Sequence, residues 1–189
     1  MSEGILKGRE RALEDAFFAQ QEEALLKRLR DADRNRSRKD AIAAALPIQD
    51  EALLDRLVAL ELGPQSVAAL ALAPLVFVAW ADGTLEPAEK EAVLRAAREA
   101  GVDKQPEAMA LLDHWLKTKP SPQLLDAWRG YAHAIVSALP PESRATMAQK
   151  TIGRARTVAQ AAGGFLGLSS RISDAEKHVL AELEKVLLG

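Results

Sequence analysis

The stretch Val67-Ala-Ala-Leu-Ala-Leu-Ala-Pro-Leu-Val-Phe-Val-Ala-Trp-Ala81 decides the fold class of this chain. It carries no charge and is rich in alanine, the best helix former. A helix that is apolar on every side either spans a membrane or lies at the centre of a helical domain. A span needs about 20 apolar residues and basic flanks, whereas this stretch contains Pro74, follows Gly63-Pro64 and lacks basic flanks. We therefore expect a buried helix over residues 65–81 and no transmembrane segment.

The composition is typical of a helical globular protein. Hydrophobic residues form 48% of the 189-residue chain, charged residues 28% and aromatic residues only 4%, while alanine is abundant. Cysteine is absent, which excludes disulfides and thiolate metal sites and favours a cytoplasmic location. The net charge of −2 provides no general attraction to nucleic acid, so we expect no nucleic-acid partner. Residues 1–10 lack the apolar core of a signal peptide.

Helical periodicity and helix-breaking residues divide the rest of the chain. No segment shows the sustained period-two alternation of a strand. We expect Gly63 to cap the helix before it, Asp82-Gly83 to form a turn, and Pro87 to begin a helix that ends at Ala100. The predicted fold is all-α, a compact domain of eight or nine helices. The other helices are predicted at residues 40–46, 50–62, 106–117, 122–139, 142–162 and 173–188.

A long amphipathic helix is predicted at residues 5–38, which gives an N-terminal arm (residues 1–38) and a helical domain (residues 39–189). Leu13, Phe17, Leu25 and Leu29 recur at spacings of four and eight and form one apolar stripe among charged residues. Because such a stripe must be covered, we expect it to bind a protein partner or a second copy of the chain. As one helix this stretch would be about 50 Å long, longer than the domain, so we expect it either to break or to project. Because Asp and Asn compete for backbone hydrogen bonds, the expected place of a break is Asp31-Ala-Asp-Arg-Asn35.

Two segments of the domain resemble each other. Asp82-Gly-Thr-Leu-Glu-Pro-Ala-Glu-Lys90 aligns with Ser169-Ser-Arg-Ile-Ser-Asp-Ala-Glu-Lys177. Each has a polar turn, then an aliphatic residue, then Ala-Glu-Lys. Ser173 and Glu176 have the spacing of a capping box, in which each side chain accepts a hydrogen bond from the other's backbone N–H. Both segments are therefore expected to be well-capped helix starts.

The first segment also has the spacing of the second half of a calcium-binding loop, with Asp-Gly followed by an aliphatic residue and a glutamate. Val78 and Trp80 occupy the places of the two leading acidic ligands, whereas a hard cation needs six or more oxygens. A weak site for a divalent cation (Ca²⁺ or Mg²⁺) is thus an alternative to simple capping.

Other residues that could carry chemistry form no recognisable site. The histidines (His114, His133 and His178) lack zinc-ligand spacing, and the tryptophans are expected in the core. The helix from Glu142 has a modest basic face, for which we expect ordinary exposure to solvent. The glycine-rich Gly163-Gly-Phe-Leu-Gly167 follows a helix rather than a strand, so it is expected to be a loop and not a phosphate site. We expect no enzyme activity.

Ala79-Trp-Ala-Asp-Gly-Thr-Leu-Glu-Pro-Ala-Glu89, together with Ile172-Ser-Asp-Ala-Glu176, resembles the bacterial tellurite-resistance TerB-like family over about residues 50–188. That resemblance implies a compact all-helical fold, an acidic turn after a core helix, and a role in stress response. Carried over by position, the acidic metal-binding or partner-binding site would be Asp82, Glu86, Glu89 and Glu176. Ser169 departs from the family, which often has an acidic residue there.

The arm is similar to a second family over about twenty residues. Arg9-Glu-Arg-Ala-Leu-Glu14, Phe17-Phe-Ala19 and Glu22-Glu23 resemble the start of the zeta inhibitor subunit of bacterial F-type ATP synthases, which inserts an N-terminal segment into the rotary motor. The sequence therefore favours a non-enzymatic binding or regulatory module of the TerB-like type. The alternative is an ATPase inhibitor that acts through its N-terminal helix.

Overall fold

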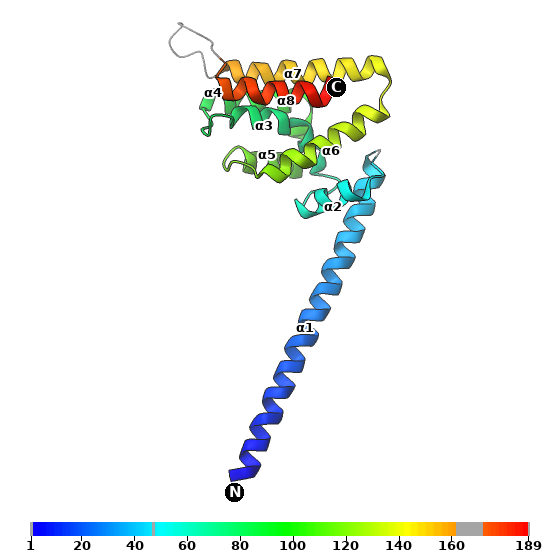
Figure 1. Cartoon of the computed structure of the whole chain (residues 1–189), viewed down its shortest axis with the longest axis vertical. Helices are drawn as coiled ribbons and strands as arrows, with labels where there is room; N and C mark the ends of the chain where they lie inside the picture. Colours follow the sequence, from blue (N-terminus) through cyan, green and yellow to red (C-terminus); the bar gives the residue numbers. More distant parts are fainter. Residues whose placement is uncertain (1, 47, 162–171, 189) are drawn as a thin grey trace. The chain divides into compact units, whose positions relative to one another are not determined.

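The computed structural model describes the backbone of residues 2–46, 48–161 and 172–188, and the side chains of these residues except those of residues 2–19 and of Glu22. This described part is all-α: it contains eight α-helices, two short 3₁₀ helices and no strand, which confirms the predicted fold class (Figure 1). Contacts between Cα atoms divide the chain into two units, Met1–Asp40 and Ala41–Gly189.

The first unit is a single helix. Helix α1 (Ser2–Ala45) is 44 residues long and continuous through residues 31–35, so the predicted break is wrong. The predicted helix at residues 40–46 is also wrong as a separate element, because its residues continue α1 up to Ala45. Asp and Asn lower helix propensity by only a few tenths of a kcal/mol each, which flanking arginine and alanine residues offset.

The core of the second unit is built on the apolar stretch that decides the fold class. The stretch forms a 3₁₀ helix, Val67–Leu72, followed by helix α3 (Ala73–Ala79). The single helix predicted over residues 65–81 is therefore wrong in detail, because Pro74 lies in the first turn of α3, where a missing N–H costs no helical hydrogen bond. Its burial is confirmed: Leu70, Val76 and Val78 are fully buried.

Six further α-helices of this unit, all within the described residues, surround the 3₁₀ helix and α3. They are α2 (Glu51–Ala59), α4 (Pro87–Glu99), α5 (Pro106–Trp115), α6 (Pro122–Ala138), α7 (Pro141–Ala161) and α8 (Asp174–Leu188). Helix α3 contacts α4, α6, α7 and α8, and α7 and α8 lie side by side (Figure 1). Helix α5 packs against the 3₁₀ helix, and α2 packs against α6. Helices α4 to α7 each begin with proline, as the helix-start rule predicts. Gly130 of α6 allows α2 to approach, since a Cβ there would lie 2.9 Å from Leu53 Cδ1.

Helix α2 is capped at both ends, but not by the predicted glycine. At its start, the Asp50 carboxylate accepts hydrogen bonds from the backbone N–H groups of Ala52 and Leu53. At its end, Glu61 has a φ of 58°, and the Leu62 N–H donates to the Leu57 carbonyl at 3.0 Å. These bonds form a Schellman motif, in which glycine usually occupies the left-handed position. The prediction of Gly63 as the cap is wrong by two residues.

The tryptophans belong to the core, as predicted. Trp115 and Trp128 are buried, and Trp80 packs against the core. The Trp80 indole N–H donates to the Trp115 carbonyl at 2.9 Å. This bond joins the end of α3 to the end of α5 directly before the first acidic turn, and it holds the start of that turn in place.

Candidate functional site

The first acidic turn connects α3 to α4. Gly83 has a φ of 97°, a conformation that glycine adopts without steric cost. One oxygen of Asp82 accepts hydrogen bonds from the backbone N–H of Thr84 at 3.0 Å and from its hydroxyl at 3.1 Å. The exposed Asp82 carboxylate therefore closes the turn, which accounts for the Asp-Gly pair without a ligand.

Glu89 lies in the first turn of α4 and is buried, with only 4% of its surface exposed. Its Oε2 atom accepts a hydrogen bond from the backbone N–H of Glu86 at 2.9 Å. Glu86 itself is exposed and occupies the N-cap position. The spacing of three residues matches a capping box, and negative charge is favourable at a helix N-terminus. The structure confirms that the first segment is a capped helix start.

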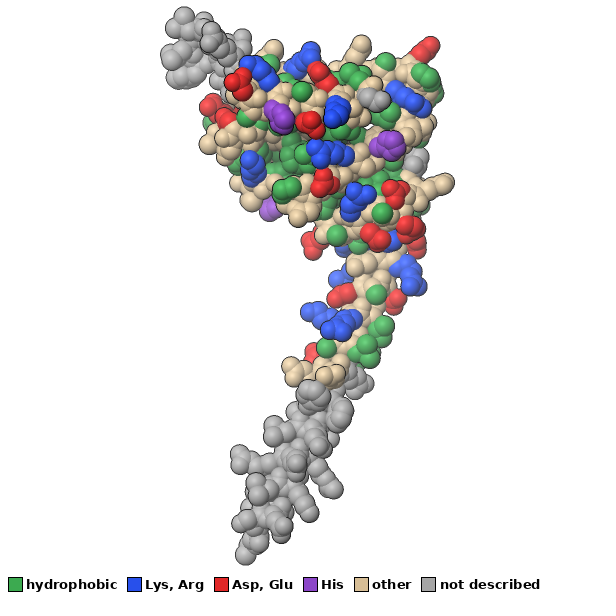
Figure 2. Space-filling view, in the orientation of Figure 1, with side chains coloured by type: hydrophobic (Ala, Val, Ile, Leu, Met, Phe, Trp, Pro, Cys, Tyr) green, Lys and Arg blue, Asp and Glu red, His purple; other side chains and the backbone are tan. Residues whose placement is uncertain are grey.

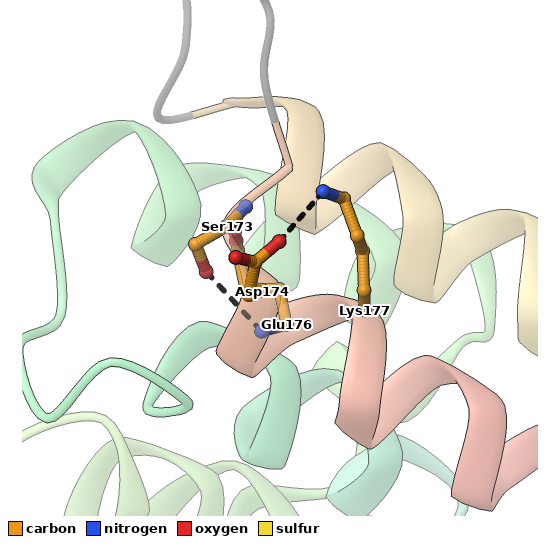
Figure 3. A network of polar contacts seen from close by, with 4 residues as sticks. All are labelled: Ser173, Asp174, Glu176 and Lys177. Carbon is orange, nitrogen blue, oxygen red and sulfur yellow. Dashed lines mark hydrogen bonds and ion pairs between the residues drawn. The ribbon is translucent and has the colours of Figure 1, made fainter.

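The second acidic turn, at the start of α8, contains the complete capping box (Figure 3). The Ser173 hydroxyl accepts from the Glu176 N–H at 3.2 Å, and the Glu176 Oε2 atom accepts from the Ser173 N–H at 2.6 Å. Next to the box, the Lys177 ammonium donates to the exposed Asp174 at 2.8 Å and lowers the pKa of that carboxyl. The sequence prediction for Ser173 and Glu176 is confirmed.

The fold brings the two buried glutamates within electrostatic range of each other. The pKa of Glu89 is raised from 4.5 to about 7, and burial is the largest cause. The negative charges of Glu176, Asp82 and Glu86 contribute to the rise, whereas the hydrogen bond from the Glu86 N–H partly opposes it. A carboxyl with this pKa changes its charge near neutral pH, where an ordinary glutamate is fully ionised.

Glu176 has an oxygen that accepts no hydrogen bond from the residues that the structure describes. The side chain is 5% exposed, and its Oε1 atom is the buried side-chain oxygen without a hydrogen-bond partner in the described part of the chain. Leaving such an atom without a partner costs about 1–3 kcal/mol. A proton or a cation between the two glutamates would reduce both this cost and their repulsion.

The structure places all four predicted acidic residues at one site but in different roles. Asp82 and Glu86 are exposed, whereas Glu89 and Glu176 are buried. Among the described side chains, no group of three or more His, Asp or Glu has the arrangement of a metal site. The donors thus fit a preformed multidentate site poorly, since Asp82 is used in its turn and both glutamates in their caps. Cation binding by these four residues stays a prediction. Ser169, where the sequence departs from the TerB-like family, lies outside the described residues.

The apolar stripe of α1 is only partly described. Leu25 and Leu29 are 56% and 54% exposed, whereas the side chains of Leu13 and Phe17 lie outside the described residues. Leu26, which the sequence analysis omitted, is 46% exposed. It is adjacent to Leu25 and so belongs to another face of the helix, which is why the spacing of four does not include it. Apolar side chains are visible on the described surface of this helix in Figure 2.

The other candidate residues of the sequence analysis are the histidines and the basic residues of α7. The three histidines are exposed, one each on α5, α6 and α8. On α7, Arg144 donates to the carbonyls of Leu139 and Ser137, while Arg154 and Arg156 form ion pairs with glutamates of α4 and α8. On the face of the second unit shown in Figure 2, both basic and acidic side chains are present.

Comparison with known proteins assigns no relative. No protein-family model, no curated protein and no solved structure matches the chain. Within the described residues, no helix is both long and apolar enough to cross a membrane. The residues of the site therefore carry the functional argument alone. The glycine-rich residues 163–167 lie outside the described residues.

Proposed function

We propose that this chain is a non-enzymatic binding and regulatory module of the TerB-like stress-response type. Its body responds to a proton or a divalent cation through Glu89 and Glu176, and α1 binds a protein. The observation that carries the proposal is the buried pair of carboxylates in a helical core. Glu89 has a pKa of about 7, and one oxygen of Glu176 has no hydrogen-bond partner in the described part of the chain. A capping box requires only its two reciprocal hydrogen bonds, so it needs neither property.

The buried pair Glu89 and Glu176 leads us to expect stabilisation by a divalent cation. At pH 8 Glu89 is ionised, since its pKa is about 7, so the site carries two buried negative charges. A divalent cation that neutralises them binds the folded state better than the unfolded chain, and it raises the melting temperature by linkage. With few ligand oxygens available, we expect affinity in the millimolar range, similar to weak calcium modules.

Calorimetry and thermal melting of the full chain at pH 8, with Ca²⁺ or Mg²⁺, test this proposal. We expect saturable binding and a higher melting temperature, both lost in the double variant Glu89→Gln, Glu176→Gln. Glutamine keeps an oxygen that accepts the capping hydrogen bond, so the variant should fold. Glu107→Gln on α5, an exposed first-turn glutamate, is the matched control. Absence of binding at millimolar cation would restrict the pair to protons and capping.

The inhibitor alternative depends on α1, which is one uninterrupted helix with exposed leucines. An arm that inserts into a rotary ATPase needs such a helix. Inhibition of ATP hydrolysis by the full chain, and its loss after deletion of residues 1–38, would support this second function. A full chain without effect on bacterial F-type ATPase would reject it.

A further inference from the structure

The apolar stripe of α1 is symmetric about Gln21. Leu13 and Leu29 each lie eight positions from Gln21, and Phe17 and Leu25 each lie four positions from it. When two identical helices pair antiparallel about a two-fold axis at one residue, positions equally distant from that residue face each other across the pair. About Gln21, Leu13 would face Leu29 of the second copy, and Phe17 would face Leu25. Each large apolar residue of the stripe thus receives an apolar partner.

The charges of α1 obey the same symmetry. Between Arg9 and Asp33, four pairs of positions equidistant from Gln21 carry opposite charges, and no pair carries like charges. A random arrangement of these charges would give about as many like pairs as opposite pairs. For residues 9–19 this argument uses only their positions on the helical backbone. The four opposite pairs are Arg9 with Asp33, Arg11 with Asp31, Glu14 with Arg28, and Asp15 with Lys27.

The pair Glu14 and Arg28 lies on the same face as the apolar stripe. Each is seven positions from Gln21, which is almost two turns of a helix with 3.6 residues per turn. Both therefore lie on the side of Gln21 and beside the stripe, where opposite charges would flank the apolar contact. Arg28 and Gln21 are exposed in the structure, which leaves this face of the first unit accessible.

A parallel pair is disfavoured by the same residues. In register, Glu14 would face Glu14 and Arg28 would face Arg28 of the second copy, which places like charges beside the stripe. An anionic membrane surface would match the basic residues after Leu26 but not Glu14, Asp15, Glu22 and Glu23, which lie before them. A second antiparallel copy places Arg28 opposite Glu14 and Lys27 opposite Asp15.

We propose that α1 is a self-recognition helix that pairs with α1 of a second copy of this chain, antiparallel and centred on Gln21. This proposal deepens the binding role of α1 and rests on it. It is independent of the acidic pair, because it concerns residues of the first unit only. Pairing would cover Leu13, Phe17, Leu25 and Leu29. It would also form an ion pair between Glu14 of one copy and Arg28 of the other twice, once on each side of the two-fold axis.

Sedimentation equilibrium of the full chain at several salt concentrations is the first test. We expect a reversible dimer that Leu25→Asp weakens at least about tenfold, because a charge would enter the apolar contact. Leu26→Asp is the matched control: Leu26 is five positions from Gln21 and faces away from it, so the dimer should persist. A chain that stays monomeric at all concentrations overturns the proposal.

Charge reversal tests the antiparallel register. Arg28→Glu would place two acidic residues opposite each other on both sides of the axis and should weaken the dimer about tenfold at low salt. Adding Glu14→Arg to the same chain should restore dimerisation, since both pairs become attractive again. Arg34→Glu is the control, because Gly8 lies opposite Arg34. Failure of the double reversal to restore the dimer rejects the register.

Cysteine crosslinking decides the orientation, because the natural chain has no cysteine. Gln21→Cys should form a disulfide-linked dimer. Ala32→Cys alone should not, whereas Ala32→Cys mixed with Glu10→Cys should, since these positions are equidistant from Gln21. Crosslinking of Ala32→Cys with itself would show a parallel pair and contradict the proposal. A monomer that binds phosphatidylserine vesicles through Leu25 would also contradict it, while the response of the body to cations would be unaffected.

Discussion

The two acidic turns place a buried glutamate at the same position, three residues after the N-cap, but they surround it differently. In the second turn the N-cap is Ser173, whose hydroxyl completes a reciprocal pair of hydrogen bonds with Glu176. In the first turn the N-cap is Glu86, a further acidic residue, followed by proline. Asp82 adds another negative charge nearby. The first turn therefore has further carboxylates around its buried carboxyl, whereas the N-cap residue of the second turn is uncharged.

This difference distinguishes two properties of the glutamates, the capping of a helix and the binding of a proton or cation. Both glutamates accept a backbone hydrogen bond, which is all that capping requires of them. The charges of Glu176, Asp82 and Glu86 around Glu89 raise its pKa. A cap with a raised pKa stabilises the fold less at neutral pH than at acidic pH. The contribution of the first turn to stability should therefore depend on pH near neutrality.

The largest expected effect is on the pH dependence of stability. The folded pKa of Glu89 is about 7 and its ordinary value is 4.5, so the folded state binds a proton more tightly than the unfolded chain between these values. The free energy of unfolding should therefore fall as pH rises from about 4.5 to about 7, by roughly 1–3 kcal/mol. Urea unfolding of the wild type and of Glu89→Gln across this range measures the difference.

Glu89→Gln should remove this loss and be the more stable protein at pH 8. Exposed Glu107 on α5 provides the control, since Glu107→Gln should follow the wild-type profile. If wild type and Glu89→Gln keep a constant difference over the whole range, Glu89 titrates equally in both states and the first turn is only a cap.

The next effect concerns the second turn. Ser173→Ala removes the hydroxyl that accepts from the Glu176 N–H and should lower the free energy of unfolding by about 1 kcal/mol. Ser121→Ala is the matched control, because Ser121 is also an N-cap but its side chain makes no capping hydrogen bond. Chemical denaturation at one pH compares the two variants. Equal losses would mean that the reciprocal box adds nothing to the second turn.

Sequence rules that involve neighbouring residues predicted where helices begin. They did not predict the burial of Glu89 or its proximity to Glu176. Pro87, Pro106 and Pro122 begin helices, and the Ser173–Glu176 box forms as its spacing indicates. Such features depend on residues within one turn of each other. The burial of Glu89 and its proximity to Glu176 depend on the packing of α4 and α8 around α3, which no local pattern contains.

The two wrong predictions, of a break in α1 and of Gly63 as a helix cap, share one physical origin. The segment with Asp31 and Asn35 stays helical because propensity is a weak preference over so few residues. Glu61 takes the left-handed position that glycine usually occupies, because the hydrogen bonds of Leu62 and Glu61 to the end of α2 hold it there. In both places the context outweighs an intrinsic preference of about 1 kcal/mol or less.

The smallest expected effect links the two turns. Glu176→Gln removes one of the negative charges that raise the pKa of Glu89, while the glutamine oxygen can still accept from the Ser173 N–H. The pH midpoint of the stability loss should move down, by less than the shift that burial causes, since burial is the larger contribution. The measurement is the same urea series with closely spaced pH values. An unchanged midpoint would show that the two turns do not interact.

The most direct test of the paired acidic turns is a carboxyl ¹³C NMR titration of the full chain, with Glu89 assigned by comparison with Glu89→Gln. The account predicts that Glu89 titrates with a pKa of about 7, well above the ordinary value of 4.5. Addition of Ca²⁺ should lower that value, because a cation favours the ionised form. A Glu89 carboxyl that titrates near 4.5, with or without Ca²⁺, would contradict the account.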